Sequence, residues 1–132
     1  MILRVAGIVE DSIVDGPGLR LTVFVQGCPH HCPGCHNPKM WPFEGGKDMT
    51  VEEISELIIS NKLIDGLTIS GGEPFSQPSA CLELVRCAQR WGLDVWVYTG
   101  YTWEALLQRA VPDELALLSR IDVLVDGQFI EA

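Results

Sequence analysis

Five short segments of the chain are rich in β-branched and other apolar residues, and each predicts a β-strand. They cover residues 4–9, 19–26, 66–70, 93–98 and 121–125. The first two are separated by the turn sequence Asp-Gly-Pro-Gly, so we expect them to form a hairpin. A long, proline-containing loop is expected over residues 27–49, between the second and third strands.

Between the later strands, apolar residues recur at helical spacing. Thr50 and Glu53 form a capping-box sequence that predicts the start of one helix. Pro78 begins a second helix, for which Gly92 is the natural C-terminal stop. Thr102 and Pro112 begin two shorter helices.

Strands and helices therefore alternate after the N-terminal hairpin. This order predicts an α/β fold with parallel strands and right-handed crossovers. Four such strands are too few to close an eight-stranded barrel, so we expect an open, partial (β/α) barrel of mostly parallel strands. The chain has 132 residues, and we expect residues 1–132 to form a single domain.

Composition narrows the class of protein. The net charge is −9 with only nine Lys and Arg, so we expect no nucleic-acid partner, because such binding needs a basic face. No apolar stretch approaches the ~20 residues of a membrane span, and residues 1–12 do not read as a signal peptide. We therefore expect a cytoplasmic protein whose thiols stay reduced.

Three of the five cysteines, Cys28, Cys32 and Cys35, lie within eight residues of one another. Three thiolates in one tight loop can hold three corners of an iron–sulfur cube and leave the fourth iron open for chemistry. We expect a [4Fe–4S] cluster on these residues. Cys81 lies on the apolar stripe of its helix and Cys87 on another side, so both are expected to be core or surface cysteines.

Other metal sites remain compatible with this loop. Structural zinc would use the three cysteines with His30, His31 or His36, although zinc sites usually pair two separated ligand couples. The string from Cys32 to His36 also matches the C-x-x-C-H haem-attachment sequence, which would require export and would leave Cys28 without a role. Unliganded thiols are a further alternative.

The cysteine spacing and three further motifs carry a resemblance to a known family. Cys-x3-Cys-x2-Cys after a first strand resembles the radical S-adenosylmethionine superfamily. Residues 12–20, followed by residues 24–28, are similar to the glycyl-radical activating enzymes. Residues 98–101 and 122–127 are similar to the branch that activates anaerobic ribonucleoside-triphosphate reductase.

The resemblance implies a radical-SAM-like fold and a specific reaction. S-adenosylmethionine would bind the open iron, be cleaved reductively to a 5′-deoxyadenosyl radical, and produce a glycyl radical on the reductase large subunit. The electron would come from an external one-electron donor such as a flavodoxin. The cofactor would carry the hard chemical step, and the protein would bind and orient it.

The expected cofactor-binding residues follow the ends of predicted strands, where ligands bind in α/β folds. After the third strand, the Glu73 carboxylate would accept hydrogen bonds from the methionyl amine, and the neighbouring glycines would admit a close approach. Plain turn and cap roles compete with this interpretation. The expected residues are Gly71, Gly72, Glu73, Pro74, Thr99 and Gly100 at the strand ends, with Gly34, Cys35, His36 and Asn37 in the cysteine loop.

The chain departs from the family pattern at two places. Gly34 stands where many members carry an aromatic residue against the adenine, and we expect His36 to take part of that role. Members of this branch usually continue beyond the last strand, so the chain ending at Ala132 is expected to be C-terminally truncated.

Arg20 lies in an apolar strand, where burial requires a partner. Asp15, Glu73 or the cofactor would supply that partner.

Two other functions compete with an activating enzyme. A radical enzyme acting on a small molecule would need a more closed barrel and more polar pocket residues than this length offers. A non-catalytic iron–sulfur or zinc module would have no use for the segment from Gly71 to Pro74.

Overall fold

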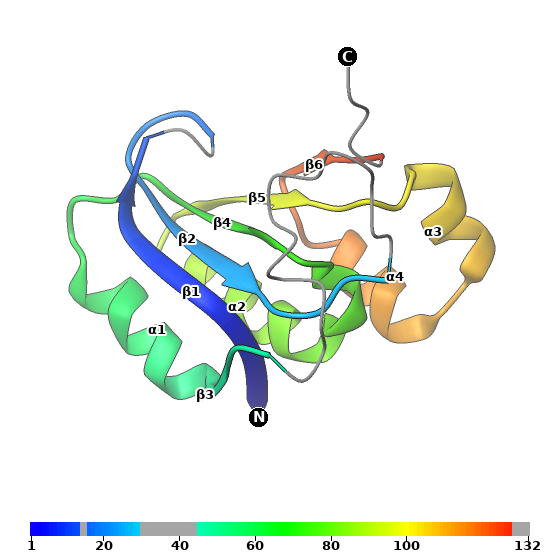
Figure 1. Ribbon diagram of the computed structural model, residues 1–132. Coiled ribbons are helices and arrows are strands. Elements are labelled where there is room, and N and C mark those ends of the chain that lie inside the picture. Colours follow the sequence, from blue (N-terminus) through cyan, green and yellow to red (C-terminus); the bar gives the residue numbers. More distant parts are fainter. Residues whose placement is uncertain (14–15, 30–44, 128–132) are drawn as a thin grey trace, which may run out of the picture.

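The computed structural model describes residues 1–13, 16–29 and 45–127, which form one six-stranded sheet with helices (Figure 1). The strand order is β3-β1-β2-β4-β5-β6. Strands β2, β4, β5 and β6 are parallel, whereas β1 runs antiparallel to both β2 and β3. The strands are β1 (Ile2–Ser12), β2 (Arg20–Val25), β3 (Lys47–Thr50), β4 (Gly66–Gly71), β5 (Asp94–Tyr98) and β6 (Val123–Val125).

The helices begin where the sequence predicts them. Thr50 caps α1 (Val51–Ser60) in a complete capping box with Glu53, and Pro78 begins α2 (Pro78–Arg90). Thr102 caps α3 (Trp103–Arg109), and Pro112 begins α4 (Pro112–Leu118). A 3-10 turn, η2 (Pro74–Ser76), follows β4 directly. No helix in the described parts of the chain combines the length and apolar character that a membrane crossing needs.

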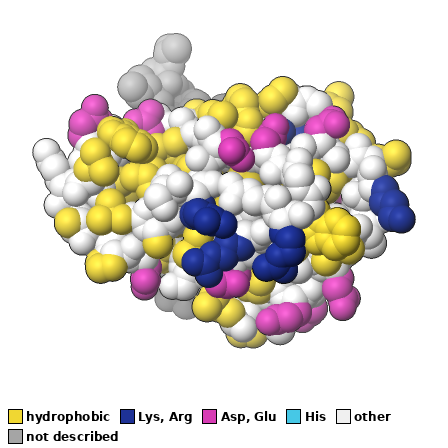
Figure 2. Space-filling view, turned by 180° about the vertical axis from the view of Figure 1, so that it is seen from behind, with side chains coloured by type: hydrophobic (Ala, Val, Ile, Leu, Met, Phe, Trp, Pro, Cys, Tyr) yellow, Lys and Arg dark blue, Asp and Glu magenta, His cyan; other side chains and the backbone are white. Residues whose placement is uncertain are grey.

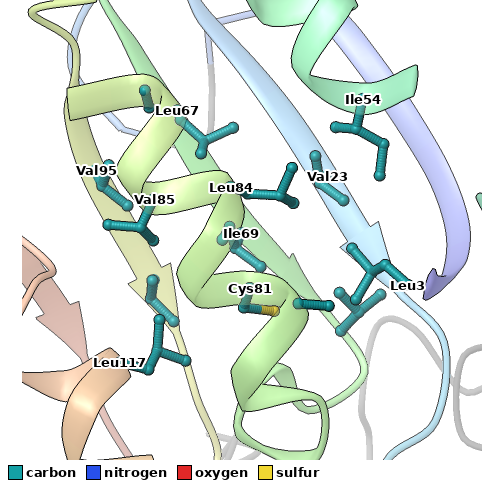
Figure 3. Close-up of a cluster of buried hydrophobic side chains, with 14 of the residues drawn as sticks. Leu3, Val23, Ile54, Leu67, Ile69, Cys81, Leu84, Val85, Val95 and Leu117 are labelled. Carbon is teal, nitrogen blue, oxygen red and sulfur yellow. The ribbon is translucent and has the colours of Figure 1, made fainter. Parts of the chain in front are cut away.

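The hydrophobic core lies between one face of the sheet and the helix layer. Strand residues Leu67, Ile69 and Val95 point toward Leu84 and Val85 of α2 (Figure 3). Helices α1 and α4 pack on either side of α2 and complete the layer. This arrangement places the alternate residues of the parallel strands on the opposite face of the sheet.

The face of the sheet away from the helices is polar and aromatic. Register pairing aligns Thr22, Thr68 and Trp96 in one row across β2, β4 and β5. Thr22 and Thr68 are fully buried. Seen from behind, in the view opposite to that of Figure 1, a small group of Lys and Arg side chains lies beside Asp and Glu side chains (Figure 2).

Strand β3 is the element that the sequence does not predict, because it lies inside the expected loop. Its sequence, Lys-Asp-Met-Thr, lacks the apolar run of a buried strand. It forms because it pairs with β1 near the N-terminus, with Ile2 opposite Thr50 and Val5 opposite Lys47. Strand β1 is also longer than predicted, and β6 begins two residues later.

Arg20 is fully buried at the start of β2, and the structure corrects one of its expected partners, Glu73. It forms an ion pair with Asp94 at 2.5 Å, not with Glu73, which lies beyond the other end of β4. Gly66 makes room for this contact, since a Cβ there would overlap the guanidinium. The Arg20 side chain donates hydrogen bonds to oxygen atoms of three segments: Pro17 O, Leu67 O, Thr68 Oγ1 and the Asp94 carboxylate. Arg20 therefore joins β2, β4 and β5 at their N-terminal ends.

Candidate functional site

The segments that carry the predicted chemistry meet at the C-terminal ends of the parallel strands. Cys28 follows β2, and the Gly71–Pro74 turn follows β4. Thr99 and Gly100 follow β5, where Thr99 N–H donates to Val125 O of β6. Parallel strands bring these ends to one edge of the sheet, as the sequence predicts.

Cys28 is buried, with 8% of its surface exposed, and it lies beside the turn that follows β4. Gly27, immediately before it, accepts a hydrogen bond at its carbonyl from Glu73 N at 2.8 Å. Gly72 N donates to Val25 O at 2.8 Å. The base of the cysteine loop is therefore attached to the β4 turn by two backbone hydrogen bonds.

The remaining predicted residues of the cysteine loop lie outside the described residues. They are Cys32, Gly34, Cys35, His36 and Asn37, with the alternative zinc ligands His30 and His31. Asp15, a candidate partner of Arg20, also lies outside them.

Gly71 and Gly72 allow two backbones to approach closely. Gly71 has φ +95°, and a Cβ on it would lie 2.6 Å from Val25 N. A Cβ on Gly72 would overlap Gly27 O. Both glycines are required because the β4 turn lies directly against the base of the cysteine loop.

The Glu73 side chain is fully buried, and its carboxylate accepts hydrogen bonds at both oxygens. Oε2 accepts from Phe75 N at 3.0 Å and from Thr99 Oγ1 at 2.6 Å. Oε1 accepts from Gly100 N at 2.8 Å. We call Glu73, Phe75, Thr99 and Gly100 the Glu73 network. It joins the β4 turn to the end of β5.

Several residues around this network were not singled out from the sequence. Tyr101 N donates to Thr99 Oγ1, and the Tyr101 carbonyl accepts from Gly127 N. The Arg109 guanidinium lies 4.7 Å from the centre of the Tyr101 ring and makes a two-pronged ion pair with Glu114. Burial, partly offset by the positive charge of Arg109, raises the pKa of the Tyr101 phenol. Of these contacts, the one between Tyr101 and Gly127 joins residues far apart in sequence. The Tyr-Thr-Gly-Tyr motif of residues 98–101 was the sequence signal that lay nearest to them.

Asp126 and Gly127, which follow β6 and belong to the motif of residues 122–127, have hydrogen-bond partners in the β5–α3 connection. An Asp126 carboxylate oxygen accepts from Trp103 N at the start of α3, at 2.8 Å. Gly127 N donates to Tyr101 O at 2.9 Å. These two bonds fix the end of β6 against the β5–α3 connection.

The two helical cysteines lie in the interior, as their positions on α2 predict. Cys81 is completely buried, and burial together with the nearby Glu73 charge raises its pKa to about 12. Its thiol lies 3.6 Å from Pro74 O. Cys87 is 7% exposed. Neither lies in a group of side chains suited to a metal ion among the described residues.

The chemistry of the donor set fits an iron–sulfur cluster. Three cysteines within eight residues supply thiolates only, and the described one, Cys28, lies at the strand ends where an α/β fold binds ligands. Residues 14–132 match the family model described as a 4Fe-4S single cluster domain.

Relatives of this chain agree with that match. The anaerobic ribonucleoside-triphosphate reductase-activating protein of Vibrio cholerae is 40% identical over 131 residues, covering 91% of this chain and 80% of the relative. The protein of the same name from Escherichia coli strain K12 is 36% identical with the same coverage. The one from Enterobacteria phage T4 is 35% identical over 125 residues, covering 89% of this chain and 76% of the relative.

The chain belongs to the family of anaerobic ribonucleoside-triphosphate reductase-activating proteins. The resemblance to the reductase-activating branch drawn from the sequence is therefore confirmed. The crystal structure of QueE from Escherichia coli matches with a TM-score of 0.61 at 18% identity, covering 77% of this chain and 54% of QueE. That match confirms the predicted fold class of the chain, an open α/β sheet of mostly parallel strands.

Proposed function

We propose that this protein cleaves S-adenosylmethionine reductively at a [4Fe–4S] cluster held by Cys28, Cys32 and Cys35. The product radical would then take a hydrogen atom from one glycine of anaerobic ribonucleoside-triphosphate reductase. The observation that carries the proposal is the attachment of the Cys28 loop to the Gly71–Pro74 turn and, through Glu73, to the end of β5. This attachment brings the base of the Cys28 loop, the Gly71–Pro74 turn and the Thr99–Gly100 segment to one edge of the sheet.

The cluster, when bound, would pass one electron to the sulfonium, whose carbon–sulfur bond breaks to give methionine and the 5′-deoxyadenosyl radical. The residues of this chain would hold the reactants in position. The three thiolates would leave one iron free for the methionyl amine and carboxylate. The Gly71–Pro74 turn and the Thr99–Gly100 segment would border S-adenosylmethionine on one side, and Gly34, His36 and Asn37 on the other.

The partners follow from the reaction and from the names of the relatives. The relatives are named for a reductase that they activate, and we propose the corresponding large subunit as the substrate of this protein. The electron would come from an external one-electron donor such as a flavodoxin. A reducing cytoplasm would keep the cluster thiols available.

Anaerobic reconstitution with iron and sulfide tests the proposal. The dithionite-reduced protein should convert S-adenosylmethionine into 5′-deoxyadenosine, and a glycyl radical signal should appear in electron paramagnetic resonance spectra after mixing with the reductase. Absence of 5′-deoxyadenosine would refute the cleavage reaction. Its formation without any glycyl radical would refute the choice of partner and favour a small-molecule substrate.

A further inference from the structure

We propose that Glu73 is a positioning residue: its carboxylate fixes Thr99 and Gly100 at the end of β5, and these residues, rather than the carboxylate, face S-adenosylmethionine. This inference rests on the proposed function for the identity of the ligand. It changes the role expected for Glu73 from the sequence, where its carboxylate would accept hydrogen bonds from the methionyl amine.

Burial separates the Glu73 side chain from the surface that a ligand would meet. Glu73 has 0% of its surface exposed, and Thr99 has 5%. Gly100 is partly exposed. The carboxylate is therefore shielded from solvent, whereas Gly100, which donates a hydrogen bond to it, is partly exposed.

The hydrogen bonds give the carboxylate a specific structural task. One oxygen accepts from Phe75 N of its own turn and the other from Gly100 N of the β5 end. Both donors are backbone N–H groups, which cannot reverse their polarity. A residue at position 73 must therefore present an acceptor at both terminal atoms, and only a carboxylate does so.

The same residue also attaches the cysteine loop. The Glu73 N–H donates to Gly27 O, immediately before Cys28. Glu73 thus holds the β5 end through its side chain and the base of the Cys28 loop through its backbone. Its position sets the distance between the thiolate loop and the Thr99–Gly100 segment.

Glu73→Gln separates positioning from direct contact with the ligand. The glutamine side chain has one acceptor oxygen and one NH₂ group. In one orientation the NH₂ group faces Phe75 N–H, and in the other it faces Gly100 N–H, so one backbone donor always loses its acceptor. A carboxylate that merely accepted from a methionyl amine would lose less, because the glutamine carbonyl still accepts.

The first measurement is amide hydrogen exchange at Phe75 and Gly100, followed by NMR in the protein without S-adenosylmethionine. In Glu73→Gln we expect one of these two amides to exchange at least about tenfold faster than in the wild type, because one of them loses its acceptor in either orientation of the glutamine amide. Unchanged exchange at both amides would overturn the proposal. This measurement needs no turnover, so it tests the hydrogen bonds of Glu73 even if the proposed reaction proves wrong.

The second measurement compares KM for S-adenosylmethionine with kcat for 5′-deoxyadenosine formation in reconstituted protein. We expect Thr99→Val, which removes a donor to Glu73, to raise KM about tenfold with little change in kcat or iron content. Thr99→Ser, which keeps the hydroxyl donor to Glu73, is the conservative variant and should rescue most of the loss seen in Thr99→Val. A normal KM in Thr99→Val, with a raised KM in Glu73→Gln, would show direct contact of the carboxylate and overturn the proposal.

The double variant completes the test. Positioning through Thr99 predicts that Glu73→Gln and Thr99→Val are not additive in their effect on KM, because both break one network. Additive effects would refute it. A wild-type protein that forms no 5′-deoxyadenosine would refute the proposed function, while the exchange at Phe75 and Gly100 would still test whether the Glu73 carboxylate holds the end of β5.

Discussion

The two ends of the parallel strands each contain a fully buried charged side chain, and the two are used differently. Arg20 lies at the N-terminal ends and Glu73 beyond the C-terminal ends. Arg20 donates to main-chain and side-chain oxygens of the neighbouring strands, and Glu73 accepts from the loops that follow them. Both obey the rule that a buried charge must be hydrogen-bonded.

The difference lies in what each network holds in place. Arg20 joins strands that already pair through their backbones, so its bonds reinforce the sheet. Glu73 joins two loops whose backbones belong to different strands, and it connects them to the base of the Cys28 loop. Changes at the Arg20 end should therefore affect stability, whereas changes at the Glu73 end should affect the cluster and its ligand.

The largest expected effect is at the cysteine loop. Cys28→Ala, Cys32→Ala and Cys35→Ala should each abolish cluster assembly, because each removes one of only three thiolate ligands. Iron and sulfide content after anaerobic reconstitution measures this loss.

Cys81→Ala and Cys87→Ala are the matched controls for this prediction. Both residues lie in α2 and are buried, and both variants should keep the iron content of the wild type. Loss of iron in either variant would contradict the assignment of the five thiols.

Removal of the Arg20 guanidinium should cost stability without affecting the cluster. Arg20→Met leaves Leu67 O and the Thr68 hydroxyl without their donor, and we expect the free energy of unfolding to fall by about 3 kcal/mol. Asp94 is half-exposed, so the ion pair itself contributes only a small part. Denaturant unfolding of the unreconstituted protein measures the change.

Arg86 offers the control for Arg20. It forms an exposed ion pair with Glu83 on the same helix, and Arg86→Met should change the free energy of unfolding by less than about 0.5 kcal/mol. Arg20→Met should bind iron normally at temperatures where it is folded. Loss of iron binding under those conditions would contradict the view that the N-terminal ends of the strands affect stability and the C-terminal ends affect the cluster.

The close approach at Gly72 gives a prediction for the other end. In Gly72→Ala the new Cβ overlaps Gly27 O, so the β4 turn or the cysteine loop must move. We expect a loss of about 2 kcal/mol in unfolding free energy together with reduced iron content. Gly7→Ala is the control, because nothing lies within 4 Å of a Cβ there, and both quantities should stay near the wild-type values. Normal iron content in a folded Gly72→Ala protein would show that the loop tolerates displacement.

Local sequence signals predicted much of this fold. The capping box of Thr50 and Glu53, the prolines at 78 and 112, and the alternation of apolar segments identify α1, α2, α4 and the parallel strands. Strand β3 was missed because its pairing with β1 is a contact between distant segments, and its own four residues carry no apolar pattern.

The candidate site, like the fold, was predicted from the sequence only in part. The sequence places the Gly71–Pro74 and Thr99–Gly100 segments at strand ends, and the structure brings them together. A strand-end carboxylate has the same sequence signature whether it faces a ligand or its own loops, so the sequence alone does not predict the hydrogen bonds that Glu73 makes to Phe75, Thr99 and Gly100. Asp94 was missed as a partner of Arg20 for a similar reason, because the two side chains meet only after β2, β4 and β5 align.

The smallest expected effect lies between the two networks, at Thr22 in the middle of β2. Its hydroxyl is fully buried and has no hydrogen-bond partner among the described residues, whereas the neighbouring Thr68 hydroxyl accepts from Arg20. Thr22→Val keeps the shape and removes the unpaired hydroxyl, so it should raise the free energy of unfolding by up to about 1 kcal/mol. Thr68→Val, by contrast, should lower it, since Arg20 loses an acceptor. Denaturant midpoints measure both changes in the free energy of unfolding. Changes of opposite sign would show that the effect depends on whether the threonine hydroxyl is hydrogen-bonded. A destabilised Thr22→Val would show that the Thr22 hydroxyl has a partner.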